Sequence, residues 1–361
     1  MTTPPAPDER VHDSGRSSRR WEIPRPGLWL GVAGLVGVMV GLVALAYGGG
    51  AIRALWFGSI GSWYALTSGT LVRAVPLILT GLGVAIAFQA GVFNIGAEGQ
   101  LLAGAAAATV VALHGPASAG KLTLAAALVA GSLAGAGWAG IAAVLRARFG
   151  VLEVISTLML NFVAADLVSY LVRGPLQEPL RIYPQSPTLP AAVRLPHFGP
   201  GTRLHWGFVI AIGLVVAASW AMSRTVAGFQ LRVTGANPRA AFTTGRIAIS
   251  RVSTRALLVS GALAGLAGAI EVTAVTYALY DNLSPGYGFT AIAVAILAGL
   301  RPYGVLASGV LFAALETGAT AMQRDAGVPA AWASVVEACL ILLIVGMIAL
   351  RERRGTGGGR A

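Results

Sequence analysis

The stretch Val92–Gln100 reads VFNIGAEGQ and separates two long apolar segments. It carries three polar side chains, Asn94, Glu98 and Gln100, among several glycines. Glycine and asparagine weaken a helix, and amide and carboxylate groups are costly in hydrocarbon. Such a segment is tolerated at membrane depth only where protein or a water-filled cavity surrounds it. The sequence therefore predicts a break between two membrane helices that lines a solute path.

The composition on either side of this stretch is that of a membrane protein. Of 361 residues, 56% are hydrophobic and 11% are charged, and the mean hydropathy is +0.74. Soluble domains carry about 25% charged residues. The net charge of +12 comes mostly from arginines in tails and loops, which positive-inside topology explains better than nucleic-acid binding. We therefore predict an all-α, polytopic bundle of transmembrane helices in the lipid bilayer.

Apolar segments of membrane-spanning length recur along the chain. We predict about ten spans, or eight if two short segments only dip into the membrane; the second of these spans meets the third at the break. The predicted spans are Pro26–Gly48, Thr67–Gln89, Ala97–Leu113, Leu122–Arg146, Val151–Val172, Trp206–Met222, 256–279, 289–300, 303–323 and 330–350.

The charge pattern divides the chain into tails and one membrane domain. Residues 1–26 and 351–361 are polar and arginine-rich, so we expect cytoplasmic tails, the first of them disordered, around a transmembrane domain at 27–350. The loop 223–255 contains several arginines and no acidic residue, which is the strongest indication in the sequence of a cytoplasmic loop. The proline-rich loop Arg173–His205 falls outside by alternation of the spans. These features predict a multi-pass membrane protein with both termini in the cytoplasm.

One segment imitates a nucleotide-binding loop. His114–Thr123 reads HGPASAGKLT, but Leu122 stands where a phosphate loop needs a magnesium-binding Ser or Thr, and no soluble strand precedes it. We interpret it as a turn between membrane helices. The histidines show no metal-ligand spacing. We expect no metal, no nucleotide and no other cofactor on this chain.

A second polar face follows in LEVISTLMLNF. Glu153, Thr157 and Asn161 lie at helical spacing and therefore share one side of the predicted span. Thr157 and Asn161 either line the solute path or join helices through hydrogen bonds.

The sequence of the basic inside loop predicts a short helix with its own start and stop signals. In GANPRAAFTTG, Asn237 is a good cap, Pro238 suits the first helical position and Gly245 suits a left-handed stop. Phe242 could enter a groove of a soluble partner. The alternative is a helical elbow at the membrane surface.

At this point the sequence resembles a known family. TVAGFQLRVTGANPRAAFTTGRI, at Thr225–Ile247, looks like the coupling loop of ABC import permeases of the branched-chain amino acid/ribose family. VFNIGAEGQ, EVISTLMLNF and the block GYGFTAIAVAILAGLRPYGV at Gly286–Val305 resemble the nucleoside-importing branch. The segment ILAGLRP is less polar than that branch would suggest.

The resemblance implies a permease subunit of a bacterial-type plasma membrane that is not an enzyme. ATP and magnesium would bind to a separate ABC ATPase subunit, docked on the coupling residues Gly235, Asn237, Pro238, Ala241, Phe242 and Gly245. A second permease would complete a heterodimer, and an extracytoplasmic lipoprotein would deliver the substrate.

Several side chains near the break are candidates for the substrate path. Glu98 either holds solute or caps backbone amides at a helix start, and we favour the second role. Aromatic rings could stack on a base, although in membrane helices they more often pack. The candidate path residues are Phe88, Phe93, Asn94, Glu98, Gln100, Thr157 and Asn161.

Other functions remain open from the residues. Permeases of the same family carry sugars or amino acids, and broken helices with intramembrane carboxylates also occur in secondary transporters. Glu271, Glu316 and Glu337 lie in apolar segments, where an ionisable residue is a functional hypothesis by default. A membrane enzyme is a further alternative, but the sequence shows no nucleophile–base pair and no set of metal ligands that such an enzyme would need.

Overall fold

The computed structural model describes residues 45–199, 201–243 and 247–329, with single residues at 34, 37, 38, 41, 331, 335, 338 and 339. This part of the chain is helical, with two isolated β-bridges and no strand. The all-α prediction is confirmed there. Both predicted tails, the stop at Gly245 and most of the first and last predicted spans lie outside the described residues.

The helices follow the predicted spans closely. The described elements are α2 (Gly49–Ser59), α3 (Trp63–Ala65), η1 (Leu66–Thr70), α4 (Leu71–Gln89), α5 (Ala97–His114), η2 (Ala117–Ala119), α6 (Gly120–Phe149), α7 (Glu153–Arg173), η3 (Ala191–Val193), α8 (Gly207–Arg224), α9 (Val226–Ala236), α10 (Pro238–Thr243), α11 (Ile249–Glu271), η4 (Val272–Thr276), α12 (Tyr287–Leu297) and α13 (Pro302–Ala326).

Six described helices are long and apolar enough to cross a membrane, and α12 is a shorter apolar helix. The count of ten spans stays a prediction. The segment 49–66, between the first two predicted spans, contains α2 and α3. The expected inside loop 223–255 is largely helical, because α8 runs on to Arg224 and α9, α10 and the first turns of α11 fill it.

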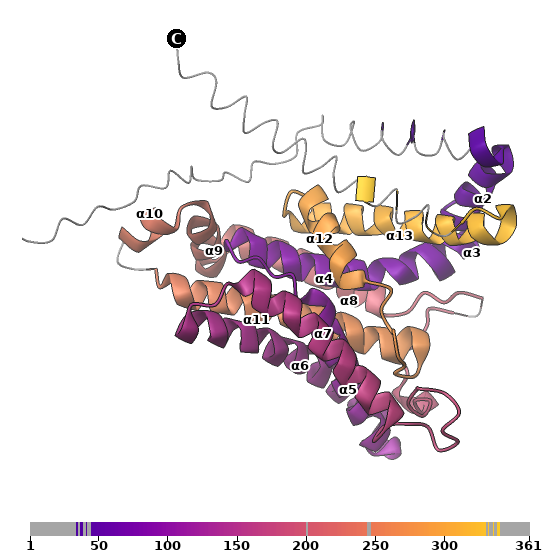
Figure 1. Ribbon diagram of the computed structural model, residues 1–361, viewed down its shortest axis with the longest axis horizontal. Helices are drawn as coiled ribbons and strands as arrows, with labels where there is room; N and C mark the ends of the chain where they lie inside the picture. The colour runs from indigo at the N-terminus through magenta and orange to yellow at the C-terminus, as the bar shows by residue number, and fades with distance from the viewer. Residues whose placement is uncertain are drawn as a thin grey trace, which may run out of the picture.

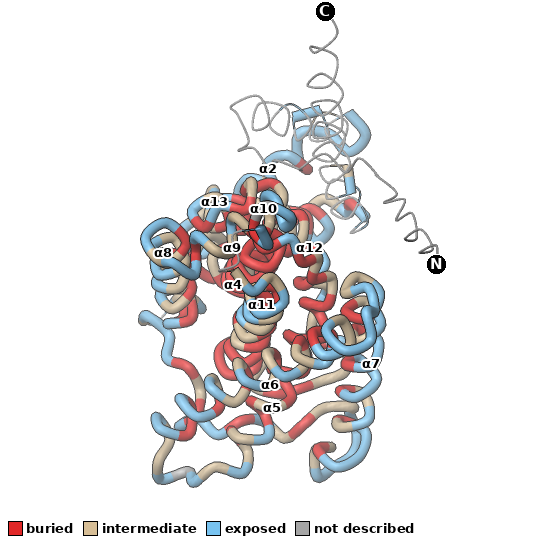
Figure 2. The backbone as a smooth tube through the Cα atoms, turned by 90° about the vertical axis from the view of Figure 1, so that its left-hand side faces the viewer, coloured by how far each residue is buried: buried red, intermediate tan, exposed pale blue. Residues whose placement is uncertain are grey.

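Some helices form the buried centre of the bundle, and others lie at its periphery. The spans Trp63–Gln89 and Ile249–Thr276 are mostly buried, whereas most residues of α6, α7 and α8 are not buried. Figure 2 shows red segments gathered around α4, with α7 and α8 on opposite flanks. The exposed side chains of these outer helices are largely apolar, as a lipid-facing surface requires.

Three helices make backbone contact through glycine. A Cβ added at Gly135 of α6 would lie 2.7 Å from the Cα of Gly265 in α11, and one at Gly131 would lie 2.9 Å from the carbonyl oxygen of Gly104 in α5. Small residues permit such packing where lipid supplies no hydrophobic drive.

Opposite ends of the molecule hold different features. Helices α9 and α10 lie at the left end of Figure 1, and α2 and α3 lie at the right end. At the right end, the loop after α7 is fastened to η4 by backbone bonds from Leu195 N to Thr273 O (2.9 Å) and from Leu189 N to Tyr277 O (2.7 Å). Both η1 and η4 are π-helices, a rare geometry that is frequent at functional sites.

The loop ends at a buried histidine. Burial lowers the pKa of His205 to about 4, because desolvation disfavours the imidazolium and His197 and Arg203 add repulsion. The Gly207 amide donates to its Nδ1 at 3.2 Å. His205 is therefore neutral at physiological pH and fixes the entry into α8.

Candidate functional site

The chain breaks between α4 and α5, as predicted. Helix α4 ends at Gln89, Gly91 adopts a left-handed conformation (φ 74°), and α5 begins at Ala97. Glycine adopts this backbone without the strain that a Cβ would bring. The broken helix places the polar side chains of the segment inside the bundle.

Asn94 is the centre of a buried hydrogen-bond network. Its Nδ2 donates to Gln100 Oε1 and to Ser260 Oγ of α11, both at 2.8 Å. Its Oδ1 accepts from the Gly96 amide and from Gln100 Nε2, both at 3.0 Å. Asn94 and Gln100 are almost fully buried. Because the amide of Asn94 is fully used, it holds the break and ties it to α11.

Helix α7 clamps the same segment from the other side. Asn161 accepts from the Gly99 amide at 2.8 Å and donates to the Ile95 carbonyl at 2.9 Å. Thr157 Oγ1 accepts from the Ile95 amide at 3.3 Å. The predicted common face of Thr157 and Asn161 therefore packs on the break and satisfies backbone groups that the lost helical turn leaves free.

Glu98 joins two helix starts. It lies in the first turn of α5, and its Oε2 accepts from the Gly288 amide, at the start of α12, at 2.6 Å. The Ser284 hydroxyl bonds the same carboxylate. The positive ends of two helix dipoles thus meet one buried negative charge. A capping role was predicted, but the amide that Glu98 caps belongs to a helix distant in sequence.

The aromatic candidates pack against each other beside this network. The rings of Phe88 and Phe93 meet edge to face, with centroids 5.1 Å apart. Phe88 is buried and Phe93 is half-buried. The structure brings the seven predicted path residues into one assembly. Their contact with solute stays a prediction.

Replacing Asn94 with leucine is expected to lower the free energy of unfolding by about 3 kcal/mol, because buried partners on Gly96, Gln100 and Ser260 lose their bonds. Thermal unfolding of the purified protein in detergent measures this loss. Gln323→Leu, at an exposed position of α13, is the control. A normal melting temperature with altered solute affinity would contradict the holding role and favour direct contact.

The coupling segment forms a helix where predicted. Helix α10 begins at Pro238, directly after Asn237, and the Ala241 amide bonds to the Asn237 carbonyl at 3.0 Å. Ala241 is buried, whereas Phe242 is 74% exposed. The helix therefore rests on the bundle and presents an aromatic side chain outward. Helix α9, which precedes it, was not predicted.

Gly235 connects this region to the break. It lies in α9 so close to the end of α4 that an added Cβ would collide with the Gln89 carbonyl. The Gln89 side chain in turn donates to the Leu300 carbonyl, between α12 and α13, at 2.7 Å. One residue thus contacts both α9 and the α12–α13 turn, immediately before Val92–Gln100.

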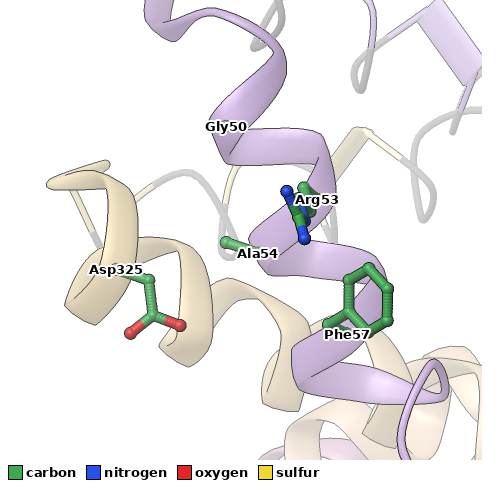
Figure 3. A pocket seen from close by; sticks show the side chains of 5 residues that line it. All are labelled: Gly50, Arg53, Ala54, Phe57 and Asp325. Carbon is green, nitrogen blue, oxygen red and sulfur yellow. The ribbon is translucent and has the colours of Figure 1, made fainter.

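A pocket of about 310 Å³ lies elsewhere, between α2 and α13. Figure 3 shows Arg53 and Phe57 on one helix and Asp325 across the gap on the other. The Arg53 guanidinium lies 5.6 Å from the centroid of the Phe57 ring. The predicted path residues do not line this pocket.

Sequence reasoning missed three residues of the assembly, namely Ser260, Ser284 and Gly288. Ser260 is the single hydroxyl residue in the apolar part of α11, residues 256–270, which is a weak signal. Gly288 lies in the block at Gly286–Val305 that the resemblance singled out. The two partners of Glu98 are separated from it by about half of the chain, so local patterns could not pair them.

Comparisons with known proteins agree with this architecture. Residues 66–345 match the family described as branched-chain amino acid transport system / permease component. The glucose ABC transporter permease protein TsgB13 of Haloferax volcanii is 39% identical, over 85% of this chain and 86% of that protein. The guanosine ABC transporter permease protein NupP of Bacillus subtilis is 36% identical, over 91% and 94%.

A third relative, the nucleoside ABC transporter permease protein NupB of Lactococcus lactis, is 32% identical over 85% of this chain and 90% of its own length. The family match covers most of the chain, and apolar helices of spanning length occupy the matched region. The chain therefore belongs to the branched-chain amino acid transport permease family and is a multi-pass permease subunit of an ABC transport system.

Proposed function

We propose that this subunit imports nucleosides or closely related compounds by alternating access. The observation that carries the proposal is the similarity to guanosine and nucleoside permeases over nearly the whole length of each. A sugar is the second candidate, because the glucose permease is 39% identical. Nucleosides and sugars share a hydroxylated ring. Branched-chain amino acids, which the family name mentions, lack such a ring.

Energy comes from a separate ATPase subunit, which binds ATP and magnesium and docks on α10. The exposed Phe242, the buried Ala241 and the basic character of the loop support this assignment. Aromatic side chains surrounded by arginines are frequent anchors of protein interfaces. Gly235, Asn237 and Pro238 shape the approach to the docking helix and its start, and Gly245 is a residue type that suits a helix stop.

The remaining partners follow from the same assignment. A second, different permease completes the membrane unit, and an extracytoplasmic lipoprotein delivers the solute to the end that holds α2 and the long loop after α7. Ten spans with both termini in the cytoplasm fit the arginine distribution. The path lies along Phe88, Phe93 and the break, which reorients when the ATPase closes.

Replacing Phe242 with alanine is expected to reduce ATP-dependent uptake of radiolabelled guanosine at least about tenfold, since interface anchors contribute about 2 kcal/mol or more. Vesicles containing the complete transporter measure uptake with and without ATP. The control is Phe162→Ala, an exposed aromatic on α7. The melting temperature of both variants should match that of the wild type.

Two results would overturn the assignment. Normal uptake and solute-stimulated ATP hydrolysis after Phe242→Ala, or after deletion of Asn237–Gly245, would show that the ATPase docks elsewhere. Uptake that persists without ATP and collapses with the proton gradient would favour a secondary transporter. Uptake of glucose but not of guanosine would select the second candidate.

A further inference from the structure

A charged cluster at the end opposite α10 has no role in the assembly described above. It is centred on Glu271, which is 6% exposed in the last turn of α11. The residue therefore lies in the interior of a membrane protein, where ionisable groups are expensive and mark functional sites.

Glu271 differs from Glu98 in its bonding. Glu98 accepts from the Gly288 amide and from Ser284. Within the described ranges, the Glu271 carboxylate accepts no hydrogen bond and makes no ion pair within 4 Å. Buried carboxylates normally have such partners. Its acceptor oxygens are thus available to hydroxyl groups that do not belong to this chain.

The positive charges that act on Glu271 come from Arg73 and Arg203. Each is fixed by another part of the structure. Arg73, on α4, donates to the Thr320 hydroxyl of α13 at 3.1 Å, and the Arg203 amide donates to the Ser68 hydroxyl of η1 at 3.0 Å. Both arginines are partly or fully exposed, whereas Glu271 is buried. The two arginines therefore lie nearer the protein surface than the carboxylate on which they act.

Two tyrosines complete the cluster. Glu271 interacts electrostatically with Tyr280 and Tyr287. Tyr287 also interacts electrostatically with Glu316 and Arg73. Tyrosine offers an aromatic face together with a hydroxyl. The formal charges of the two arginines and two glutamates cancel, which suits an uncharged ligand.

The backbone around the cluster is unusual on both sides. Glu271 directly precedes the π-helix η4, and Ser68 lies within the π-helix η1. Tyr277, at the end of η4, has a positive φ of 57°, and Arg194 lies over its ring at 4.5 Å. Strain of this kind persists where the surroundings fix it, and it gathers at ligand sites.

We propose that Glu271, with Arg73, Arg203, Tyr280 and Tyr287, forms an outer binding site for the ring hydroxyls of an uncharged sugar-bearing solute. The carboxylate accepts from two neighbouring hydroxyls, the arginines donate to hydroxyl oxygens, and a tyrosine face covers the ring. The proposal rests on the proposed function, because it concerns the solute that the transporter carries.

The test uses the complete transporter in membrane vesicles with saturating binding protein, so that delivery does not select the solute. The probes are radiolabelled guanosine and 2′,3′-dideoxyguanosine, which lacks the ribose hydroxyl pair. Glu271→Gln is expected to reduce the guanosine rate about tenfold or more, since it removes charged hydrogen bonds, and to change the dideoxyguanosine rate less than about twofold. Asp166→Asn, an exposed carboxylate on α7, is the control.

Arg203→Gln lies in an exposed loop and gives a second, milder variant if Glu271→Gln does not reach the membrane. It should lower the guanosine rate about threefold and leave the dideoxyguanosine rate unchanged. Equal losses for both probes, or no loss for either, would overturn the site. A wild-type transporter that carries neither guanosine nor glucose would contradict the proposed function itself, and the site with it.

Discussion

Replacing Gly288 with valine is expected to destabilise the protein by about 3 kcal/mol, since neither backbone at this contact can retreat. A Cβ at Gly288 would lie 2.5 Å from the Cα of Glu98 and 2.8 Å from the carbonyl carbon of Ala97. Valine adds two methyl groups beyond that Cβ. The start of α12 would be pushed from the start of α5, and the bond from the Gly288 amide to Glu98 would break.

The measurement is thermal unfolding in detergent, together with the amount of protein in the membrane fraction. Gly137→Val is a matched control, because Gly137 lies inside α6 with nothing near its Cβ position. Loss of the amide bond leaves a buried carboxylate underbonded, which adds to the steric cost. Equal melting temperatures for the two valine variants would show that α5 and α12 separate freely at this point.

Replacing Gly235 with valine is the second large effect, and we expect it to reduce uptake at least about tenfold. The added Cβ would collide with the Gln89 carbonyl, so α9 must move away from α4. Gln89 also bonds the Leu300 carbonyl. The displacement therefore reaches the coupling helix, the break and the α12–α13 turn together.

Uptake of guanosine and ATP hydrolysis are measured on the same vesicles. Gly213→Val, inside α8 with open space at its Cβ position, is the control. Hydrolysis that no longer responds to solute in the Gly235 variant, with normal insertion, would fit a broken connection between α10 and the break. Uptake equal to that of the Gly213 variant would contradict it.

Helix start and stop signals in the sequence predicted the ends of the neighbouring helices well. The start of α10 at Pro238, the end of α4 at Gln89 and the start of α5 at Ala97 all follow from residues next to them. Helix α9 was missed even though Thr225 caps it, with its hydroxyl accepting from the Gly228 amide at 3.1 Å. A threonine before an apolar run was a usable signal.

Pairing between distant segments was beyond reach of the sequence. The polarity of Glu98 and Asn94 predicted an interior role, but not that Gly288 and Ser260 would be their partners. The π-helices could not be predicted either, because the shift from i+4 to i+5 bonding leaves no composition pattern. Glu271 was visible as an intramembrane carboxylate, whereas the arginines that act on it come from α4 and from a loop.

The glycine contacts among α5, α6 and α11 limit how this molecule can move. Where backbones touch at Gly104, Gly135 and Gly265, no side chain lies between the helices to change rotamer and absorb a displacement. Sliding by one residue would drive carbonyls into Cβ atoms, so the three helices must travel as a single rigid block. Large changes in shape are then confined to the borders of that block, where longer side chains can change rotamer as shear motions require.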